Sequence, residues 1–341
     1  MSTHTSAVPV ALTAARATVA PAMRAATAKL SPAVRRVVEY HFGWIDADGV
    51  PASGSGGKAL RPALALLSAQ AAGAAPDRGV PAAVAVEFVH NFSLLHDDIM
   101  DGDTERRHRP TAWTVFGTAA AILAGDGLLV ASVSTLLDAP EEWTGSAAVS
   151  LMTATQRLIT GQADDLSFER RDDVTLDECL DMAAGKTAAL LSCAASIGAE
   201  LVGADHDLVL GLAEFGEHLG LAFQLVDDLL GIWGEPEVTG KPVLADLRAR
   251  KKSLPVVAAL RGTGVEVDEL TRLYLNTPVL DERLLRRVAE LVRLTGGYDW
   301  ARDEADRQVI AARRCVEGLD APAAVRDHLL QLAAFTTRRT W

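Results

Sequence analysis

Apolar residues recur at helical spacing through most of this chain, whereas strand-like alternation of apolar and polar positions is scarce. Apolar positions three and four residues apart form one stripe on a helix, which buries against its neighbours. The pattern predicts helices over residues 32–44, 63–72, 81–100, 119–137, 148–159, 176–199, 208–231, 254–260, 281–294, 298–316 and 322–335. Polar loops rich in Gly or Pro separate them, notably at 46–57 and 232–246. The sequence therefore predicts an all-α fold.

The first residues of the chain do not continue this pattern. Residues 1–25 are rich in Ala, Thr, Ser and Pro and lack the basic-then-apolar order of a signal peptide. We expect a disordered tail there and a single helical domain over 26–341. The most apolar long stretch, 119–137, contains Asp126, so we expect no transmembrane segment.

Composition narrows the class of protein. The chain has 341 residues, of which 49% are hydrophobic, enough to build a large core. A net charge of −12 argues against a surface that binds nucleic acid. The cysteines Cys179, Cys193 and Cys315 have neither zinc-ligand nor disulfide spacing, so we expect a cytoplasmic protein.

Two acidic clusters end apolar helices: Asp97, Asp98 and Asp101 in the first, Asp227 and Asp228 in the second. Asp97 and Asp101 share a helix face, and Asp98 lies about 100° round from Asp97. Like charges this close repel one another, and a divalent cation relieves the strain. Oxygen ligands without Cys or His favour Mg²⁺ over Zn²⁺. A solvated acidic turn explains either cluster alone, but two clusters flanked by basic residues favour a metal site.

Basic residues flank the acidic ones. Lys58 and Arg61 follow a Gly-rich loop at i,i+3 spacing, where a helix start can also meet an anion. Arg106 and Arg107 directly follow the first acidic cluster, which suits a clamp on a polyanion. Lys186 lies inside an apolar helix and needs an anion or a route to solvent. A solvated loop with two exposed cations also explains Lys58 and Arg61, and a surface ion-pair loop also explains Arg106 and Arg107.

Taken together, these residues resemble the trans-isoprenyl diphosphate synthase (polyprenyl synthetase) family. The matching stretches occur in family order over roughly residues 50–256. They are Gly57-Lys58-x-x-Arg61-Pro62, Glu87-x-x-His90, Asp97-Asp98-x-x-Asp101, Arg106-Arg107-x-x-Pro110, Gly161-Gln162, Lys186-Thr187, Phe223-Gln224-x-x-Asp227-Asp228, Gly240-Lys241-Pro242-x-x-x-Asp246 and Lys251-x-Ser253-Leu254-Pro255. The resemblance implies an isoprenoid synthase-type helical bundle around a deep central cavity. The two aspartate motifs would face each other across its mouth, and the family is usually homodimeric.

The resemblance also implies a reaction. An allylic diphosphate (dimethylallyl, geranyl or farnesyl) ionises, isopentenyl diphosphate attacks the cation head-to-tail, and a proton leaves. Mg²⁺, about three ions with substrate bound, would neutralise the departing pyrophosphate. The implied metal ligands are Asp97, Asp101 and Asp227, with Asp98 and Asp228 beside them. The implied catalytic residues are Asp97, Asp98, Asp101, Asp227, Lys186, Gln224 and Lys241. The implied substrate-binding residues are Lys58, Arg61, His90, Arg106, Arg107, Lys186, Thr187, Gln224, Lys241 and Lys251. Of these, Lys58, Arg61, His90 and Arg107 would hold isopentenyl diphosphate.

The sequence departs from the family pattern at three places. Gly231 stands where the second motif usually has a third Asp, so we expect activity with weaker support for that metal. Ala59 replaces a frequent Arg, and His108 a frequent Gly. For product length, Phe92 and Ser93, five and four residues before Asp97, resemble C20 synthases, which predicts geranylgeranyl diphosphate.

Two other functions remain open on the sequence. A class I terpene cyclase also ionises prenyl diphosphates at Asp-rich metal sites, but it has no second diphosphate for Lys58, Arg61 and His90 to hold. A non-catalytic subunit of a heteromeric synthase commonly loses the acidic motifs. The first motif is whole here, and Gly231 keeps that alternative open.

Overall fold

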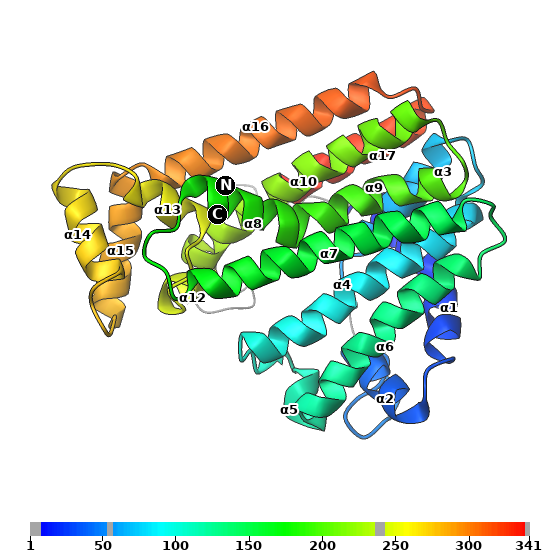
Figure 1. Ribbon diagram of the computed structural model, residues 1–341, viewed down its shortest axis with the longest axis horizontal. Helices are drawn as coiled ribbons and strands as arrows, with labels where there is room; N and C mark the ends of the chain where they lie inside the picture. Colours follow the sequence, from blue (N-terminus) through cyan, green and yellow to red (C-terminus); the bar gives the residue numbers. More distant parts are fainter. Residues whose placement is uncertain (1–7, 53–56, 236–242, 338–341) are drawn as a thin grey trace. The chain divides into compact units, whose positions relative to one another are not determined.

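The computed structural model describes residues 8–52, 57–235 and 243–337. The described chain is helical almost throughout, which confirms the predicted all-α class (Figure 1). The α-helices are α1 (Val10–Thr27), α2 (Pro32–His41), α3 (Leu60–Ala71), α4 (Val80–Met100), α5 (Ala112–Phe116), α6 (Thr118–Leu137), α7 (Thr144–Phe168), α8 (Leu176–Ala183), α9 (Ala189–Leu201), α10 (His206–Trp233), α12 (Ala245–Arg248), α13 (Leu254–Leu260), α14 (Val265–Tyr274), α15 (Glu282–Leu294), α16 (Gly297–Gly318) and α17 (Ala323–Thr337).

Short elements complete the described chain. A 3₁₀ turn, η1 (Pro76–Gly79), precedes α4, and a π-helical turn, η2 (Ala184–Ala188), joins α8 to α9. Strands β1 (Glu105–Arg106) and β2 (Arg109–Pro110) form an antiparallel hairpin with Arg106 opposite Arg109. Sequence periodicity located most of the long helices but missed α1, α5, α12 and α14.

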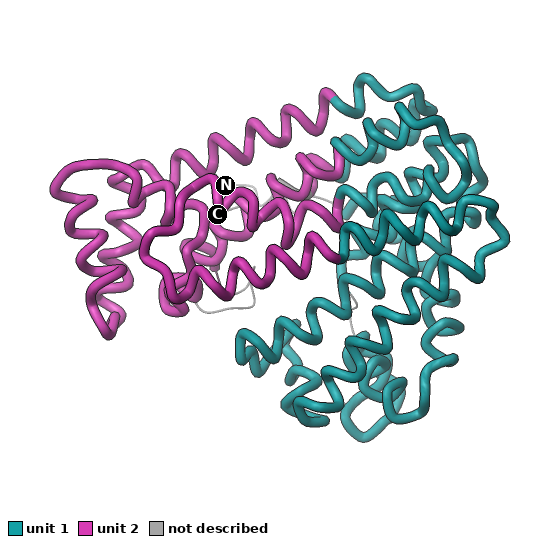
Figure 2. The backbone as a smooth tube through the Cα atoms, viewed as in Figure 1, with its two compact units in different colours: residues 1–155, 192–214, 315–332 teal, residues 156–191, 215–314, 333–341 magenta. Residues whose placement is uncertain are grey.

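The chain divides into two compact units where one domain was expected (Figure 2). Unit 1 comprises residues 1–155, 192–214 and 315–332, and unit 2 comprises 156–191, 215–314 and 333–341. Asp97 belongs to unit 1 and Asp227 to unit 2. Each acidic cluster is therefore described within its own unit, and their meeting across a cavity mouth stays a prediction.

Unit 1 is built around α4, which packs against α3 and α6. Pro81 suits the first turn of α4, and Val84, Phe88 and Val89 have no exposed surface. A helix that is apolar nearly all round belongs in a core. This core fixes the end of α4, which is where the first acidic cluster begins.

The N-terminal segment is a correction to the sequence analysis. Residues 10–25, expected to be disordered, form most of α1, and this helix buries Leu12, Ala15 and Val19 as it packs on α3 and α4 within unit 1. These positions are three and four residues apart and form one stripe. The sequence concealed it because alanine and threonine dominate the segment and Pro21 lies inside the helix.

Two apolar clusters lie among the described residues of unit 2. One joins α8, α10, α13 and α16 through residues such as Cys179, Leu229 and Ala301. The other joins α13, α14 and α15 around Tyr274 and Leu285. Both clusters contain buried residues of α10, so the helix that carries the second acidic motif is packed on both.

Three described helices are long and apolar enough to cross a membrane by length and composition alone. They are Thr118–Leu137, Leu176–Leu201 and His206–Trp233, and 33%, 78% and 44% of their apolar windows are buried. The expected lack of such a segment is therefore not confirmed.

Candidate active site

The first acidic cluster lies at the C-terminal end of α4. The Asp101 N–H donates to the Asp97 carbonyl at 2.8 Å, so helical geometry continues through the cluster. Asp97 and Asp101 therefore share a face, as predicted, and Asp101 is exposed. Asp98 is different, because only 1% of its surface is exposed.

Asp98 holds the hairpin that follows α4. Its Oδ1 accepts from Arg106 Nε on β1 at 2.6 Å, and its main-chain carbonyl accepts from Asp103 N–H at 2.9 Å. Burial raises the pKa of Asp98, while the charge and hydrogen bond of Arg106 lower it. Asp98 Oδ2 is buried and has no hydrogen-bond partner among the described residues. Asp98 thus positions Arg106 beside the cluster.

The hairpin turn aims Arg107 from a strained backbone. Arg107 and His108 have φ of 54° and 60°, the left-handed pair that a two-residue hairpin turn requires. Side chains with a Cβ adopt this conformation at a cost of about 1 kcal/mol each. Glycine adopts this conformation without that cost, which explains why the family frequently has Gly at the position of His108. A pocket beside the turn is lined by His41, Asp98, Arg106 and Arg107, among others.

Beside this hairpin, Glu87 is a buried carboxylate surrounded by cations. Burial raises its pKa, and the charge of Arg61, a hydrogen bond from Asn91 and the charge of Arg107 lower it. Asn91 Nδ2 donates to Glu87 Oε1 at 3.2 Å, and Asn91 Oδ1 lies 3.0 Å from His41 Nε2. Glu87 is thus the counter-ion that allows Arg61 and Arg107 to lie close together.

Arg61 and His90 line the same region. Burial lowers the pKa of Arg61 to about 10, and Glu87 opposes that change. Arg61 Nε is buried without a hydrogen-bond partner among the described residues. Burial and the nearby arginines also hold the pKa of His90 well below its ordinary value, so His90 is neutral. A buried cation with spare donor capacity is suited to binding an anion.

Lys58 precedes α3 and is exposed. Between Lys58 and Arg61, Ala59 adopts a left-handed φ of 57° at the N-cap of α3. This conformation turns the chain sharply into the helix. Backbone strain of this kind is common where side chains must be aimed at a ligand.

In unit 2, Lys186 lies in the π-helical turn η2. Its Nζ forms an ion pair with Asp165 Oδ2 of α7 at 2.5 Å, so Asp165 is the anionic partner of this lysine. Asp165 was not singled out in the sequence analysis. Glycines allow the turn's close packing: a Cβ at Gly161 would overlap the Lys186 backbone, and one at Gly220 would overlap Ala188. The predicted Gly161 motif therefore has a steric role.

A hydrogen-bonded chain connects η2 to the second acidic motif. Thr187 Oγ1 donates to Gln224 Oε1 at 2.5 Å, and Gln224 Nε2 donates to Asp228 Oδ1 at 2.7 Å. Asp228 Oδ2 accepts from Leu254 N–H at 2.8 Å. Burial and the charge of Asp246 raise the pKa of Asp228 to about 7. Asp228 is buried, whereas Asp227 is exposed.

Gly231 stands where the motif usually has a third Asp, and a neighbouring side chain explains why a glycine is required there. A Cβ at Gly231 would overlap the Asp246 carboxylate. Asp246 comes from α12, fifteen residues further on, within the matched Gly240-Lys241-Pro242 stretch. The Asp246 carboxylate therefore occupies the space that a side chain at position 231 would fill.

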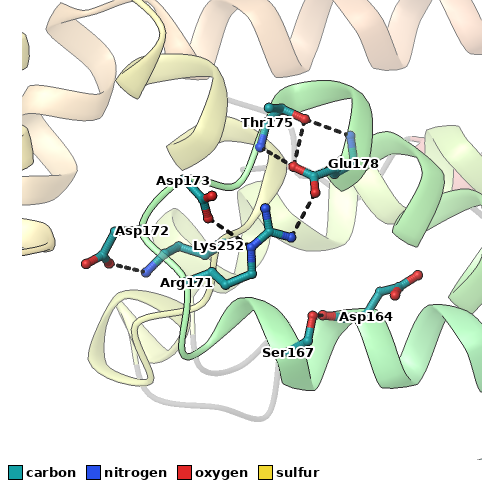
Figure 3. A network of polar contacts seen from close by, with 8 residues as sticks. All are labelled: Asp164, Ser167, Arg171, Asp172, Asp173, Thr175, Glu178 and Lys252. Carbon is teal, nitrogen blue, oxygen red and sulfur yellow. Dashed lines mark hydrogen bonds and ion pairs between the residues drawn. The ribbon is translucent and has the colours of Figure 1, made fainter.

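The segment carrying Lys251 is fixed by its main chain. The Lys251 carbonyl accepts from Tyr274 Oη at 2.8 Å, and the Lys252 carbonyl accepts from Cys179 Sγ at 3.1 Å. Lys252 is 8% exposed, and its Nζ lies 3.6 Å from Asp172 Oδ1 (Figure 3). The main chain of Lys251 is thereby fixed, and Leu254, three residues further on, binds Asp228.

Figure 3 shows how the loop before α8 is tied down. Arg171 donates to Asp173 Oδ1 at 2.9 Å and to Glu178 Oε1 at 2.8 Å. Thr175 and Glu178 form a capping box at the start of α8. The hydrogen bond from Arg171 and those from Thr175 lower the pKa of Glu178 to about 2. This network sets the start of the helix that leads into η2.

With both halves of the geometry described, the comparisons with known proteins decide the family. The family model described as polyprenyl synthetase matches residues 50–292. The chain belongs to the polyprenyl synthetase family. The (2E,6E)-farnesyl diphosphate synthase of Mycobacterium tuberculosis is 46% identical over 324 residues, 94% of this chain and 90% of that protein. The geranylgeranyl diphosphate synthase of the same organism is 42% identical over 327 residues, 95% of this chain and 92% of that protein.

A solved structure agrees. The polyprenyl synthetase from Streptomyces coelicolor A3(2) superposes with a TM-score of 0.90 at 51% identity, covering 96% of this chain and 98% of that one. This polyprenyl synthetase is therefore an enzyme, a trans-prenyltransferase, and members of the family use Mg²⁺. The expected helical isoprenoid synthase fold is confirmed.

The donors present suit Mg²⁺. The side chains of Asp97, Asp101 and Asp227 offer carboxylate oxygens only, and Mg²⁺ keeps waters and substrate phosphates in its shell. Within the described part of the chain, no three His, Cys, Asp or Glu side chains are grouped to hold a metal by themselves. Lys241, a predicted catalytic and binding residue, lies outside the described residues.

The two residues predicted to set product length differ in surroundings. Phe92 is 6% exposed, and its ring packs edge-on against His96, with the ring centroids 4.9 Å apart. His96 Nε2 lies 3.1 Å from the Ile122 carbonyl of α6. Ser93 is 8% exposed, and its hydroxyl donates to the His90 carbonyl. By helical phase, Ser93 lies about 40° and Phe92 about 140° from Asp97.

Proposed function

We propose that this prenyltransferase condenses isopentenyl diphosphate head-to-tail with an allylic diphosphate to give a linear trans-prenyl diphosphate. The observation that supports this most is the arrangement along α4. His90, among the cations around Glu87, and Asp97 are seven residues apart, so they share a helix face about 10 Å apart. One helix thus presents a metal-independent cationic site and an acidic site. A reaction that joins two diphosphates needs both.

The acidic residues would hold the allylic diphosphate. Asp97, Asp101 and Asp227 would bind Mg²⁺, which when bound supplies the positive charge that stabilises the departing pyrophosphate. Arg106 is held in place by Asp98, and Lys186 by Asp165, so each presents a fixed cation for the same diphosphate. Asp98 and Asp228, predicted as metal ligands, are buried and hydrogen-bonded, and we assign both to positioning.

The cationic site would hold isopentenyl diphosphate. Lys58, Arg61 and Arg107 supply positive charge, and neutral His90 can donate one N–H to a phosphate oxygen. Glu87 offsets part of that charge when no diphosphate is bound. The site requires no metal, which separates this function from that of a terpene cyclase.

We retain geranylgeranyl diphosphate, C20, as the proposed product. The similar proteins include a farnesyl diphosphate synthase at 46% identity and a geranylgeranyl diphosphate synthase at 42%, so homology alone does not establish C20. Ser93 lies on the side of α4 nearer Asp97, and its small side chain leaves room for a longer product there.

The experiment that tests this function uses purified protein, Mg²⁺, isopentenyl diphosphate and each allylic primer in turn. We expect linear products extended by five carbons per step, no product with EDTA, and C20 as the main product. Cyclised hydrocarbons would indicate a cyclase. No turnover with any primer would indicate a non-catalytic subunit.

We also propose a cytoplasmic homodimer. On α6, Ile122, Leu123, Val130 and Leu137 are 41%, 57%, 68% and 54% exposed, more apolar surface than an isolated helix face usually leaves in water. A second copy is the proposed occupant of that face. Light scattering on the purified protein should give twice the chain mass of 36.1 kDa, and replacing Val130 by Glu should halve it.

A further inference from the structure

Helix α1 carries a cation at the edge of its packed face. Leu12, Ala15 and Val19 are buried, and Arg16 follows Ala15 by about 100° of helical rotation. Its side chain therefore leaves α1 at the rim of the contact with α3 and α4. Arg16 itself is exposed at this rim.

Arg16 reaches Gly57, the last residue of the predicted loop 46–57. Its Nη2 donates to the Gly57 carbonyl at 2.6 Å, although the two residues are 41 positions apart. Gly57 directly precedes Lys58. From another side, a Cβ at Gly57 would lie 3.0 Å from Arg107 Nη2, closer than ordinary packing allows. Gly57 is therefore held between a guanidinium of α1 and a guanidinium of the hairpin.

Arg16 also belongs to the electrostatic cluster around Glu87. Its charge lowers the pKa of Glu87 and that of Arg107. Arg16, Arg61 and Arg107 all act on Glu87, so three positive charges stand against its single negative charge. Cations held this close repel one another, and a diphosphate of about three negative charges relieves that repulsion.

We propose that Arg16 is a positioning residue for the diphosphate of isopentenyl diphosphate. It holds the Gly57 carbonyl so that Lys58 is correctly aimed, and it adds a positive charge to the site. The N-terminal helix is thereby part of substrate recognition. This inference rests on the proposed function of the Lys58–Arg61 site.

Kinetics with two substrates separate this role from simple helix packing. Arg16→Ala should raise the KM for isopentenyl diphosphate about tenfold. The kcat and the KM for the allylic diphosphate should stay within about twofold. Arg16→Lys should restore most of the loss, because an ammonium group can still donate to the Gly57 carbonyl and keeps the charge.

The matched control is Arg24→Ala. Arg24 is on the same helix, and its guanidinium lies 4.3 Å from the centre of the Trp44 ring. This variant loses the same charge from α1 and should leave both KM values unchanged. Equal effects of the two variants, or equal rises in both KM values for Arg16→Ala, would overturn the proposal.

Calorimetry distinguishes failure of this inference from failure of the proposed function. Isopentenyl diphosphate is titrated into wild type and Arg16→Ala in EDTA, where no turnover occurs. A Kd about tenfold weaker for Arg16→Ala supports the role of Arg16 even if no primer is extended. An unchanged Kd, or no binding to the wild type, refutes it.

Discussion

The Arg106 Nε lies 2.6 Å from the Asp98 Oδ1, and this ion pair ties the β1–β2 hairpin to the end of α4. The side chain of Asp98 is 2% exposed and that of Arg106 is 28% exposed. In unit 2, Asp228 is likewise buried and binds the main chain at Leu254, just after Lys251. In each motif the first Asp is accessible and the second holds a basic segment in place.

Substitutions of Asp98 and Asp101, two aspartates of the first motif, should therefore have different effects on stability. Asp98→Asn should lower stability by about 2 kcal/mol, because it weakens a pair that is only partly exposed. Asp101→Asn should leave the melting temperature unchanged, since Asp101 is exposed. Both variants should lose most activity. Thermal unfolding and steady-state kinetics measured on the same preparations check this; a stable Asp98→Asn protein would contradict the positioning role.

Arg61 and Glu87 should show strong coupling. Arg61→Ala should raise the KM for isopentenyl diphosphate at least tenfold and should destabilise the fold by about 2 kcal/mol, because Glu87 is left buried with less compensation. Glu87→Gln in the Arg61→Ala background should recover the melting temperature but not the KM. A double-mutant cycle over stability and KM measures this. Recovery of both quantities would show that Arg61 acts only as a partner of Glu87.

Product length should depend more on Ser93 than on Phe92. Ser93→Phe should shorten the main product by at least one five-carbon unit, because Ser93 lies about 40° from Asp97 on α4. Phe92→Leu keeps an apolar side chain facing His96 and should change the length less. Chromatographic sizing of the products checks both. A longer product from Phe92→Leu would instead make Phe92 the floor.

An aspartate at position 231, which would restore the third Asp of the motif, should be incompatible with Asp246. Gly231→Asp should lower stability by about 3 kcal/mol, because the new side chain overlaps the Asp246 carboxylate and adds a like charge. Gly231→Asp combined with Asp246→Ala should recover most of that loss. Gly231→Ala serves as the steric control, since it adds no charge. Urea denaturation of the four proteins gives the free energies.

The network at the start of α8 should be sensitive to acid. Glu178 has a pKa of about 2 in the fold, below its ordinary value of 4.5. Its stabilisation is therefore complete above pH 4.5 and is lost as the pH falls toward 2. The difference in melting temperature between wild type and Glu178→Gln should be clear at pH 7 and smaller at pH 3.5. Asp177→Asn, which removes a neighbouring charge on the same turn, should show no such narrowing.

Sequence alone located the long helices, the two acidic clusters and their basic companions. Apolar spacing and short motifs are local patterns, so Asp97, Arg61 and Gln224 could be identified. Partners supplied by distant segments could not. Nothing near Lys186 marks Asp165 as its counter-ion, and nothing near Gly231 marks Asp246. Arg16 was missed because the helix that carries it is rich in alanine and threonine and contains Pro21, which concealed its apolar stripe.

The π-helical turn that carries Lys186 has a consequence for how this enzyme tolerates change. A π turn holds one residue more than a regular α turn. Deleting one residue from Ala184–Ala188 would fuse α8 and α9 into a single uninterrupted helix of better local geometry. It would also rotate everything on one side by about 100° relative to the other. The continuous helix would point the Lys186 ammonium group in a different direction. A deletion that regularises the helix would therefore be expected to lower activity.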